Sequence, residues 1–476
     1  MPITKIADQT IRLILDLKDQ NKNPDEIANI LRLKPIHVRT ILAAHQTESL
    51  SIEVDSQRRT GPSTSLAELE RPATLPNRPI PPIVGESDPG EEEDDDDAEK
   101  VRPDAIYIGE DEGYSGTVYW EPTNKADVPN PHLMIMGESG SGKTYSTQCL
   151  IAELAQKNIP SIVFDYSQSF EVAHLEKPFL KFTNVKEHVL GDTGLPINPL
   201  QVFPNDPGGP KRVAARVSDV FDAVYHLGDI QRRVVIDGIL GAFRRAGMDD
   251  ADSGTWTKLP PTLGDLQVML DDLSADKSYA NAKNATGVSA RMITFFMLGC
   301  DSNAAWSWDD LLNDSSKVHI LQFRGLEGKT QRVLVELLLW HLFYFLKNRG
   351  QHPLSLFCVL DEAHHLSFRE SGPVDSLLRE ARKFGLGVIF ASQQPEDFSP
   401  AAFSNTASKL VFQITDPMAK VSRSLAAKCS NYQDADDIKH IVSQQKQGHA
   451  LFVTKNKGFL VRVADFRKRA TLWQHQ

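Results

Sequence analysis

Two short stretches of the sequence carry residue types that handle phosphate and metal ions. The first is GESGSGKT, residues 137–144, which fits the pattern GxxxxGK[ST]. Glycines in such a loop permit backbone angles that turn successive N–H groups toward phosphate oxygens, and the lysine neutralises phosphate charge. The second is LFCVLDE, residues 356–362, an apolar run that ends in two carboxylates. One carboxylate after a buried strand holds a metal ion and the next polarises a water molecule. Together the two stretches predict binding and hydrolysis of ATP with Mg²⁺.

The pattern predicts a role for each of these residues. Lys143 is expected to reach the β- and γ-phosphates, and the Thr144 hydroxyl is expected to coordinate Mg²⁺. Asp361 is expected on the metal side, with Glu362 as the general base. A buried strand that merely ends in a solvated acidic turn is the alternative for this pair. The other residues of the predicted nucleotide-binding loop are Gly137, Glu138, Ser139, Gly140, Ser141 and Gly142.

The elements around these stretches follow an α/β pattern. An apolar run, Leu133–Met136, precedes the glycine-rich loop and a helical pattern follows it over 145–157. Strand-like and helix-like runs alternate through residues 105–476, which predicts a mainly parallel sheet flanked by helices. A largely helical insertion is expected at about 170–315. The other expected strands are 105–109, 117–120, 161–165, 319–323, 356–361, 387–392 and 409–415, with a final hairpin from 449–454 and 458–463.

The letters DEAH at 361–364 are also the signature of a class of helicases. That class needs a second lobe with an arginine-bearing QxxGRxGR motif, and the sequence contains nothing like it. Ala363, His364 and His365 are therefore interpreted as incidental, and DEAH as the end of a metal-binding strand.

The stretch LLREARKFGLGVIFASQQP, residues 377–395, closely resembles the HerA/FtsK superfamily of ring-shaped DNA-pumping ATPases, the HerA branch in particular. The resemblance also includes the glycine-rich loop and INPL at 197–200, and it spans roughly residues 105–465. It implies a RecA-like P-loop NTPase core, assembly as a homo-hexamer, and hydrolysis coupled to movement of double-stranded DNA.

The same resemblance implies two further site residues. Gln393 matches the polar sensor that reads the γ-phosphate from the neighbouring strand. Arg382 matches an arginine proposed to reach into the next subunit's nucleotide, with Arg379 as its rival. The two arginines have the spacing to share one helix face, although both could instead be ordinary solvated helix residues.

Two features depart from the HerA pattern. A motif like DxxGEY is expected after the helix that follows the glycine-rich loop, but residues 165–170 read DYSQSF. Ser169 thus replaces the glutamate, which leaves the rate of hydrolysis open. The HerA N-terminal barrel is absent or reduced to a few strands.

Residues 1–104 predict two further segments. Residues 1–46 resemble a helix-turn-helix, which fits either a DNA major groove or a small helical docking module. Residues 47–104 are rich in Ser, Thr, Pro and acids and predict a disordered linker. Eleven acids and two bases lie in 85–104, so most of the formal charge of -11 belongs there. This acidic run is interpreted as a solvated spacer, with a DNA mimic or partner tail as the alternative.

The cysteine content and the longest apolar run indicate the cellular compartment of the protein. The four cysteines lie far apart, which argues against a zinc site or a disulfide framework and suits a reducing cytoplasm. The longest apolar run, Val333–Leu346, is shorter than the ~20 residues that cross a bilayer, so no membrane segment is expected. The candidates for gripping DNA are equally good formers of surface salt bridges: Lys211, Arg212, Arg216, Arg232 and Arg233.

Three functions remain open at this point. The first is a cytoplasmic DNA translocase or helicase motor that acts with a partner nuclease or effector in DNA processing or anti-phage defence. The second is a conjugation-type coupling ATPase. The third is an ATP-switched regulator whose helix-turn-helix binds DNA while the ATPase only signals.

Overall fold

The computed structural model describes residues 102–473, except 114–115, 205, 299–306, 327, 416, 418, 427–434 and 456. The predicted helix-turn-helix at 1–46 and nearly all of the predicted linker at 47–104 lie outside the described residues, so both stay predictions.

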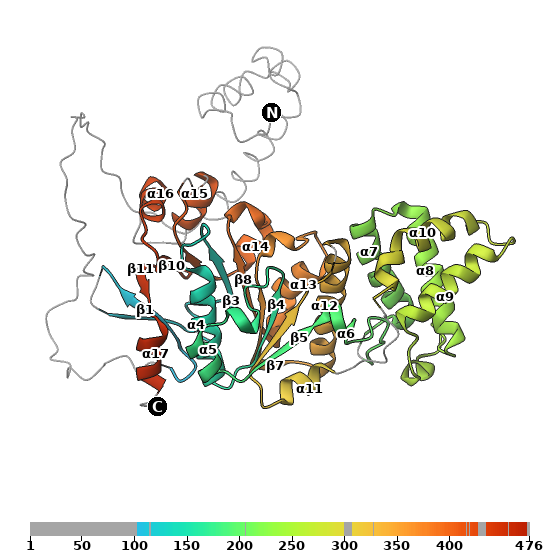
Figure 1. The fold of residues 1–476 in the computed structure, drawn as a ribbon, viewed down its shortest axis with the longest axis horizontal. Coiled ribbons are helices and arrows are strands. Elements are labelled where there is room, and N and C mark those ends of the chain that lie inside the picture. Colours follow the sequence, from blue (N-terminus) through green and yellow to red (C-terminus); the bar gives the residue numbers. More distant parts are fainter. Residues whose placement is uncertain are drawn as a thin grey trace, which may run out of the picture. The chain divides into compact units, whose positions relative to one another are not determined.

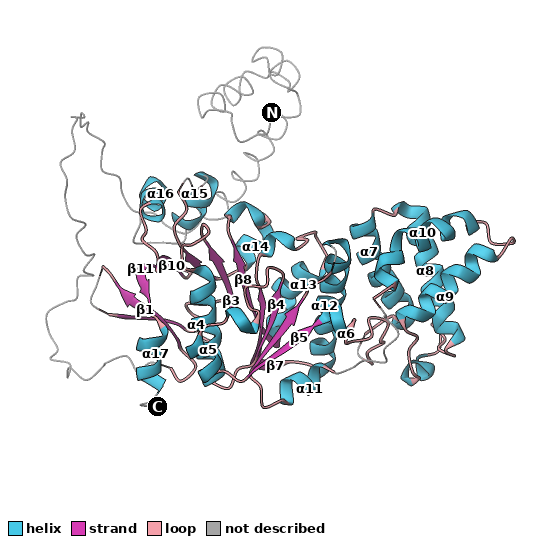
Figure 2. Cartoon of the chain, in the orientation of Figure 1, coloured by secondary structure: helices cyan, strands magenta, loops and turns pink. Residues whose placement is uncertain are grey.

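One 11-stranded sheet, in the order β2-β1-β11-β10-β9-β3-β8-β7-β4-β6-β5, forms the centre of the ATPase region (Figures 1 and 2). The strands from β9 to β5 run parallel to one another, and β10, β11, β1 and β2 join antiparallel. The mainly parallel sheet and the short antiparallel strands were predicted, and both are confirmed. The strands are β1 (Ile106–Asp111), β2 (Thr117–Trp120), β3 (His132–Met136), β4 (Ser161–Asp165), β5 (Val185–Val189), β6 (Val318–Gln322), β7 (His352–Leu360), β8 (Phe384–Ser392), β9 (Ser408–Val411), β10 (His449–Val453) and β11 (Gly458–Val463).

Helices cover both faces of the sheet, as a parallel sheet requires. Alternate residues of β3 point to opposite faces, and each set belongs to a different apolar core. Leu133 and Ile135 share their core with helix α4, whereas Met134 and Met136 share theirs with α12 and α13. The helices around the sheet are α4 (Lys143–Gln156), α5 (Lys177–Phe182), α6 (Leu190–Thr193), α11 (Trp308–Asn313), α12 (Gly328–Arg349), α13 (Pro373–Glu380), α14 (Pro400–Asn405), α15 (Ala419–Ala426), α16 (Ala435–Ser443) and α17 (Phe466–Trp473).

A group of four helices forms the insertion that the sequence predicts, and Figure 1 shows them together: α7 (Gly209–Tyr225), α8 (Gly228–Arg245), α9 (Leu263–Ala275) and α10 (Ala282–Phe296). Helix α7 packs on α12. The Arg216 guanidinium on α7 lies 3.6 Å from the Tyr344 ring centroid on α12, and its nitrogen lies 2.6 Å from the buried Asp206 carboxylate.

The structure departs from the sequence prediction at β5, which lies inside the stretch expected to be largely helical. Val185–Val189 pairs parallel with β6 at the end of the sheet. The sequence VKEHV has apolar residues only at its two ends and none of its residues is buried, which suits an edge strand. Its partner β6 begins only at Val318, so no local pattern links the two.

The predicted buried helix at 333–346 forms the middle of α12, and Leu338 and Leu342 are fully buried there. Among the described residues, no helix combines the length and apolar character needed to cross a bilayer. In the same part of the chain, Cys149 and Cys358 are free and buried, and no cluster of three or more potential metal-binding side chains occurs.

Candidate active site

The glycine-rich loop connects the carboxyl end of β3 to the start of α4. Gly142 precedes the helix with φ 110°, and Gly137 and Gly140 also have positive φ. A Cβ atom on Gly137 would lie 2.6 Å from the Phe412 side chain, so only glycine fits there. No side chain caps the first turn of α4 in this described loop. The amino end of a helix without a cap presents its N–H groups and its positive dipole end to an anion.

Lys143 opens α4 and points back over this loop. Its Nζ donates to the Glu138 carbonyl oxygen at 3.0 Å, and the Ser141 hydroxyl donates to the same oxygen at 2.7 Å. Burial lowers the pKa of Lys143, while the nearby carboxylates of Glu362, Asp361 and Glu138 oppose that shift. The lysine is therefore close to the acids of the second stretch, although more than two hundred residues separate them in the sequence.

The segment after β9 holds the loop from the other side. The Glu138 carboxylate accepts from the Thr415 backbone N–H at 2.6 Å and from its hydroxyl at 2.9 Å. The Gly448 N–H donates to the Ser141 carbonyl oxygen at 3.1 Å. Thr144, the second residue of α4, is partly exposed beside this loop. The loop is thus braced by the segment after β9 and by Gly448, which directly precedes β10.

Asp361 follows β7 directly and is almost fully buried. Its Oδ2 accepts from the Ser169 hydroxyl at 2.5 Å and from the Ser167 hydroxyl at 3.3 Å. Burial raises the pKa of Asp361 to about 6; the Ser169 hydrogen bond lowers it, and the neighbouring Glu362 and Asp165 raise it further. A buried carboxylate with this penalty is well suited to a cation that would neutralise it.

Glu362 adopts a left-handed backbone conformation with φ 49°, which is strained for a residue other than glycine. Its Oε1 lies 3.4 Å from Nε2 of Gln393, which follows the adjacent strand β8. Its Oε2 lies 3.2 Å from Nδ1 of His364. The predicted base and the predicted sensor therefore face each other across the ends of β7 and β8.

Three residues that were given no catalytic role in the sequence lie at this site. Ser167 and Ser169 follow β4, the neighbour of β7, and Ser169, at the position of the expected glutamate, makes the shorter bond to Asp361. His364, which was interpreted as incidental, has its ring beside the Glu362 carboxylate. The carboxyl ends of adjacent parallel strands meet at one edge, and that rule was the available signal.

Arg382 lies at the opposite edge of the sheet from the glycine-rich loop. It belongs to a 3-10 turn, Ala381–Lys383, before β8, and donates to the Pro129 carbonyl oxygen before β3. These positions are at the amino ends of the strands, whereas the glycine-rich loop is at the carboxyl end of β3. Arg379 lies on α13 and pairs with Asp375 at 2.7 Å. The expected common helix face is wrong, because α13 ends at Glu380 between the two arginines.

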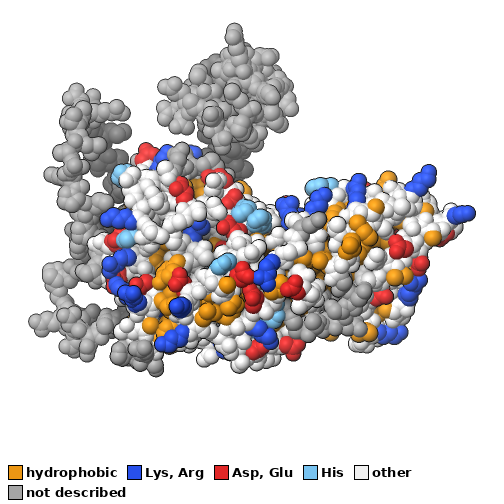
Figure 3. Space-filling view, viewed as in Figure 1, with side chains coloured by type: hydrophobic (Ala, Val, Ile, Leu, Met, Phe, Trp, Pro, Cys, Tyr) orange, Lys and Arg blue, Asp and Glu red, His pale blue; other side chains and the backbone are white. Residues whose placement is uncertain are grey.

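The five basic residues of the insertion that were candidates for gripping DNA have partners within the chain. Arg216 forms an ion pair with Asp206, and Arg233 forms one with Asp237. Ion pairs also involve Lys211 and Arg232. Arg212 donates a hydrogen bond to a backbone carbonyl oxygen. Figure 3 shows Lys and Arg side chains interspersed with Asp and Glu over this region of the visible face. The salt-bridge alternative therefore describes four of these five side chains in this structure.

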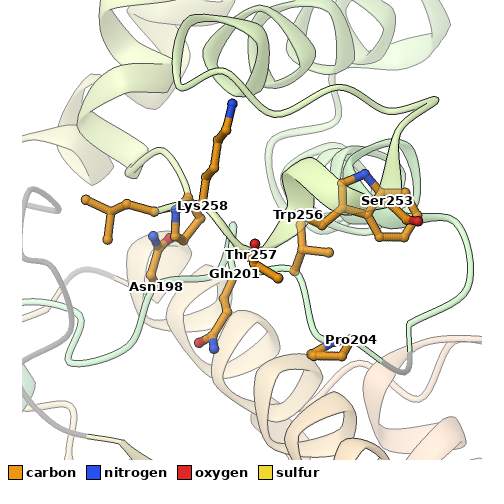
Figure 4. Close-up of a pocket in the computed structure, with 10 residues that line it drawn as sticks. Asn198, Gln201, Pro204, Ser253, Trp256, Thr257 and Lys258 are labelled. Carbon is orange, nitrogen blue, oxygen red and sulfur yellow. The ribbon is translucent and has the colours of Figure 1, made fainter.

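A cavity of about 750 Å³ lies where INPL meets the insertion (Figure 4). Asn198 crosses this junction by donating to the Pro261 carbonyl oxygen at 2.9 Å, and Trp256 forms part of the cavity wall. None of the predicted site residues lines the cavity. It is separate from the site at the strand ends.

The residues at the carboxyl edge fit ATP and Mg²⁺. The uncapped amino end of α4 and Lys143 suit phosphate oxygens, and the Asp361 carboxylate with the Thr144 hydroxyl supplies the oxygen ligands that Mg²⁺ prefers. When bound, Mg²⁺ would neutralise charge on the phosphates. Glu362 is available to orient and deprotonate a water molecule, and Gln393 to hold that carboxylate in place.

Known proteins are similar to this chain in one sequence segment and in fold. The family described as helicase HerA, central domain, matches residues 124–205. The structure of VirB4 of Thermoanaerobacter pseudethanolicus is similar with a TM-score of 0.56 and 17% identity, over 75% of this chain and 96% of that one. The bacterial conjugative coupling protein TrwBdeltaN70 has a TM-score of 0.45 and 13% identity, over 70% and 84% of the two chains.

The genome packaging NTPase B204 from Sulfolobus turreted icosahedral virus 2, in complex with AMP, has a TM-score of 0.34 and 13% identity, over 70% of this chain and 97% of that one. A search of curated proteins found no match. The VirB4 similarity establishes the RecA-like P-loop NTPase fold. The match over residues 124–205, taken together with that fold, supports a P-loop ATPase of the HerA/FtsK type.

Proposed function

We propose that the protein is an ATP-driven motor that moves double-stranded DNA as a homo-hexamer. Lys143 and the loop from Gly137 to Thr144 bind the phosphates, and Thr144 and Asp361 hold Mg²⁺. Glu362 acts as general base and Gln393 as sensor. Arg382 enters the active site of the next subunit, with Arg379 as the alternative. The cytoplasm is the proposed location, and a nuclease or effector in DNA processing or anti-phage defence is the proposed partner.

The observation that carries the proposal is the arrangement of the Glu362 carboxylate. It lies 3.4 Å from the Gln393 amide nitrogen and near enough to Lys143 to shift that lysine's pKa. Strand β8 lies between β3 and β7, so the sensor stands between the phosphate loop and the metal-side acid. A base held by a sensor next to a phosphate loop is an arrangement for hydrolysis coupled to nucleotide state, as a motor requires.

The Arg382 position supports a role between subunits. It lies at the amino ends of the strands, and β3 alone spans five residues, or about 16 Å, between that edge and the phosphate loop. Arg382 is therefore poorly placed to reach the nucleotide of its own chain. A neighbouring chain in a ring is the partner that would receive it.

DNA-dependent ATP hydrolysis tests this proposal. We expect ATPase activity to rise with the length of added duplex DNA and to fall as salt weakens phosphate contacts. A triplex-forming strand placed ahead on the duplex should be displaced only with ATP, and Lys143→Ala serves as the inactive control. Tight binding to one short sequence without stimulation would favour the ATP-switched regulator instead. Stimulation without strand displacement would favour a coupling ATPase.

A further inference from the structure

A second cavity, of about 640 Å³, opens at the amino ends of β3, β7 and β8, on the edge of the sheet away from the phosphate loop. Three cationic side chains line it: Lys125, Arg382 and Lys383. His352 and several prolines complete the wall, and its described lining residues include no Asp or Glu. A concave site with one sign of charge attracts a ligand of the opposite sign.

The cationic groups are available. Lys125, Arg382 and Lys383 are all exposed, and none of them forms an ion pair with any described residue. Arg382 donates to the Pro129 carbonyl oxygen, which holds its guanidinium against the cavity wall. The guanidinium has five N–H donors, so others stay free for an anion. The site is therefore suited to a group of carboxylates or phosphates.

The chain itself arrives at the rim of this cavity. The Asp104 carboxylate accepts from the hydroxyl of Thr123, a lining residue. The Pro103 carbonyl oxygen accepts from Lys157 Nζ at 2.8 Å, and Arg102 lies 3.9 Å from Glu121, which directly precedes the lining residue Pro122. The first described residues are thus anchored beside the cavity.

An acidic segment precedes this anchor by a few residues. Asp94–Asp97 and Glu99 provide five carboxylates with one base, Lys100, before the anchored residues. Asp97 precedes Asp104 by seven residues, and seven extended residues span at most about 25 Å. The carboxylates are therefore within reach of Lys125, which is two residues from Thr123.

We propose that the acidic segment 94–99 docks into this cationic cavity of its own chain, with its carboxylates facing Lys125, Arg382 and Lys383. Three observations point to this occupant: the charge complementarity, the lack of acids in the cavity wall, and the anchor that brings the segment to the rim. Docking would cover Arg382 in a free chain. If Arg382 acts in the active site of the next subunit, as proposed above, docking would lower ATPase activity. Ring closure would then have to displace the acidic segment from Arg382.

Carbodiimide crosslinking of the full-length protein, read by mass spectrometry, tests the docking without ATP or DNA. The reagent joins a carboxylate to a lysine amine with loss of water. We expect crosslinks from residues 94–99 to Lys125 and Lys383 to exceed those to Lys157, which contacts the same anchor but lies outside the cavity. The yield of crosslinks to Lys125 and Lys383 should fall several-fold in 1 M NaCl, because charges are screened beyond about 3 Å at that ionic strength. A mixture of ¹⁵N-labelled and unlabelled protein shows whether both partners belong to one chain.

Matched variants separate the cavity from general attraction. Arg382→Gln keeps both lysines and should lower the crosslink yield, whereas Arg379→Gln, which alters an arginine outside the cavity, should not. The proposal would be overturned if Lys157 gave the higher crosslink yield, or if the yield changed neither with salt nor in Arg382→Gln. Residues 94–99 would then be interpreted as a solvated spacer. Crosslinks only between different chains would overturn it in favour of docking on a second copy.

ATPase activity then tests the consequence separately. Changing Asp94, Asp95, Asp96 and Asp97 together to Asn should raise specific activity at low protein concentration more than changing Glu91, Glu92 and Glu93 to Gln. If the crosslinks form as expected but activity stays unchanged, docking stands and the proposed masking of Arg382 is wrong.

Discussion

The proposed roles of Glu362 and Lys143 are different: Glu362 serves turnover and Lys143 serves nucleotide binding. The carboxylate stands at a strained backbone position, faces Gln393 and lies near the lysine. Strain of this kind, about 1–3 kcal/mol, persists where the surrounding structure enforces it, and it is common at functional sites. In the proposed mechanism, this strained position directs the Glu362 carboxylate toward the attacking water molecule.

Replacing each residue should separate the two roles. Lys143→Ala removes the charge that neutralises the phosphates and should abolish ATP binding. Glu362→Gln keeps the size and the contact with Gln393, so it should bind ATP as wild type does and lose turnover by about 10²–10⁴-fold. Calorimetry with a non-hydrolysed ATP analogue and steady-state ATPase assays measure the two effects. Equal ATP affinity in Lys143→Ala and wild type would contradict the assignment of the loop.

The residues of the two sequence motifs could be predicted because each motif is local. Gly137 to Thr144 and the Asp361–Glu362 pair lie in unbroken stretches with a known chemical purpose. The contacts of Ser169 and His364 could not be predicted from such patterns. Ser169 meets Asp361 only because β4 and β7 are neighbours in the sheet, and His364 meets Glu362 only because the backbone turns back there.

Helix α12 links the sheet to the insertion through a buried histidine. His341 Nδ1 accepts from Trp308 Nε1 at 2.8 Å, and its Nε2 lies 3.1 Å from Gln201 Oε1. Indole is only a donor, so this geometry requires the neutral imidazole with its proton on Nε2. Burial, with a smaller effect from the Arg216 charge, lowers the pKa of His341 to about 3.

This histidine predicts a loss of stability in acid. A base whose pKa is depressed by folding stabilises the fold above its unfolded pKa, and that stabilisation is lost as pH falls from about 6.5 toward 3. Between pH 7 and pH 5, this histidine alone should lower the free energy of unfolding by about 2 kcal/mol. Urea unfolding followed by circular dichroism should show this loss. His341→Gln keeps a donor and an acceptor and should reduce the difference between pH 7 and pH 5 by about that amount, whereas an unchanged pH dependence would contradict the assignment.

The elements themselves were predictable where their patterns are long. The apolar strands β3, β4, β7 and β8 and the helix α12 match the runs seen in the sequence. The edge strand β5 was missed, because its five residues are half exposed and its partner is remote in sequence. The end of α13 was also missed, since the helical pattern continues through Arg382 although the structure changes to a 3-10 turn after Glu380.

The boundary near residue 105 is a prediction for the whole chain. Strand β1 begins at Ile106, and Asp104 and Pro103 make the last contacts before it. A fragment of residues 102–476 should fold and bind ATP, because it keeps the sheet and these contacts. A fragment of 105–476 should be slightly less stable, by at most about 1 kcal/mol, because it loses exposed contacts only. Insolubility or loss of nucleotide binding in both fragments would show that the boundary is wrong.

The central claim is that each active site is built from two chains. An arginine supplied by a neighbour contributes about 10³–10⁵ in rate. Specific activity should therefore rise with protein concentration, and light scattering should detect a particle of about six times the chain mass of 53.0 kDa. Neither Arg382→Ala nor Glu362→Gln should turn over well, although both should bind ATP and form rings.

Mixing these two inactive variants is the most direct test. A mixed ring contains junctions where an intact Glu362 from the Arg382→Ala chain meets an intact Arg382 from the Glu362→Gln chain. ATPase activity of the mixture, measured after subunit exchange, should rise well above that of either variant alone. Rings that exchange subunits and stay inactive at every mixing ratio would contradict the shared site.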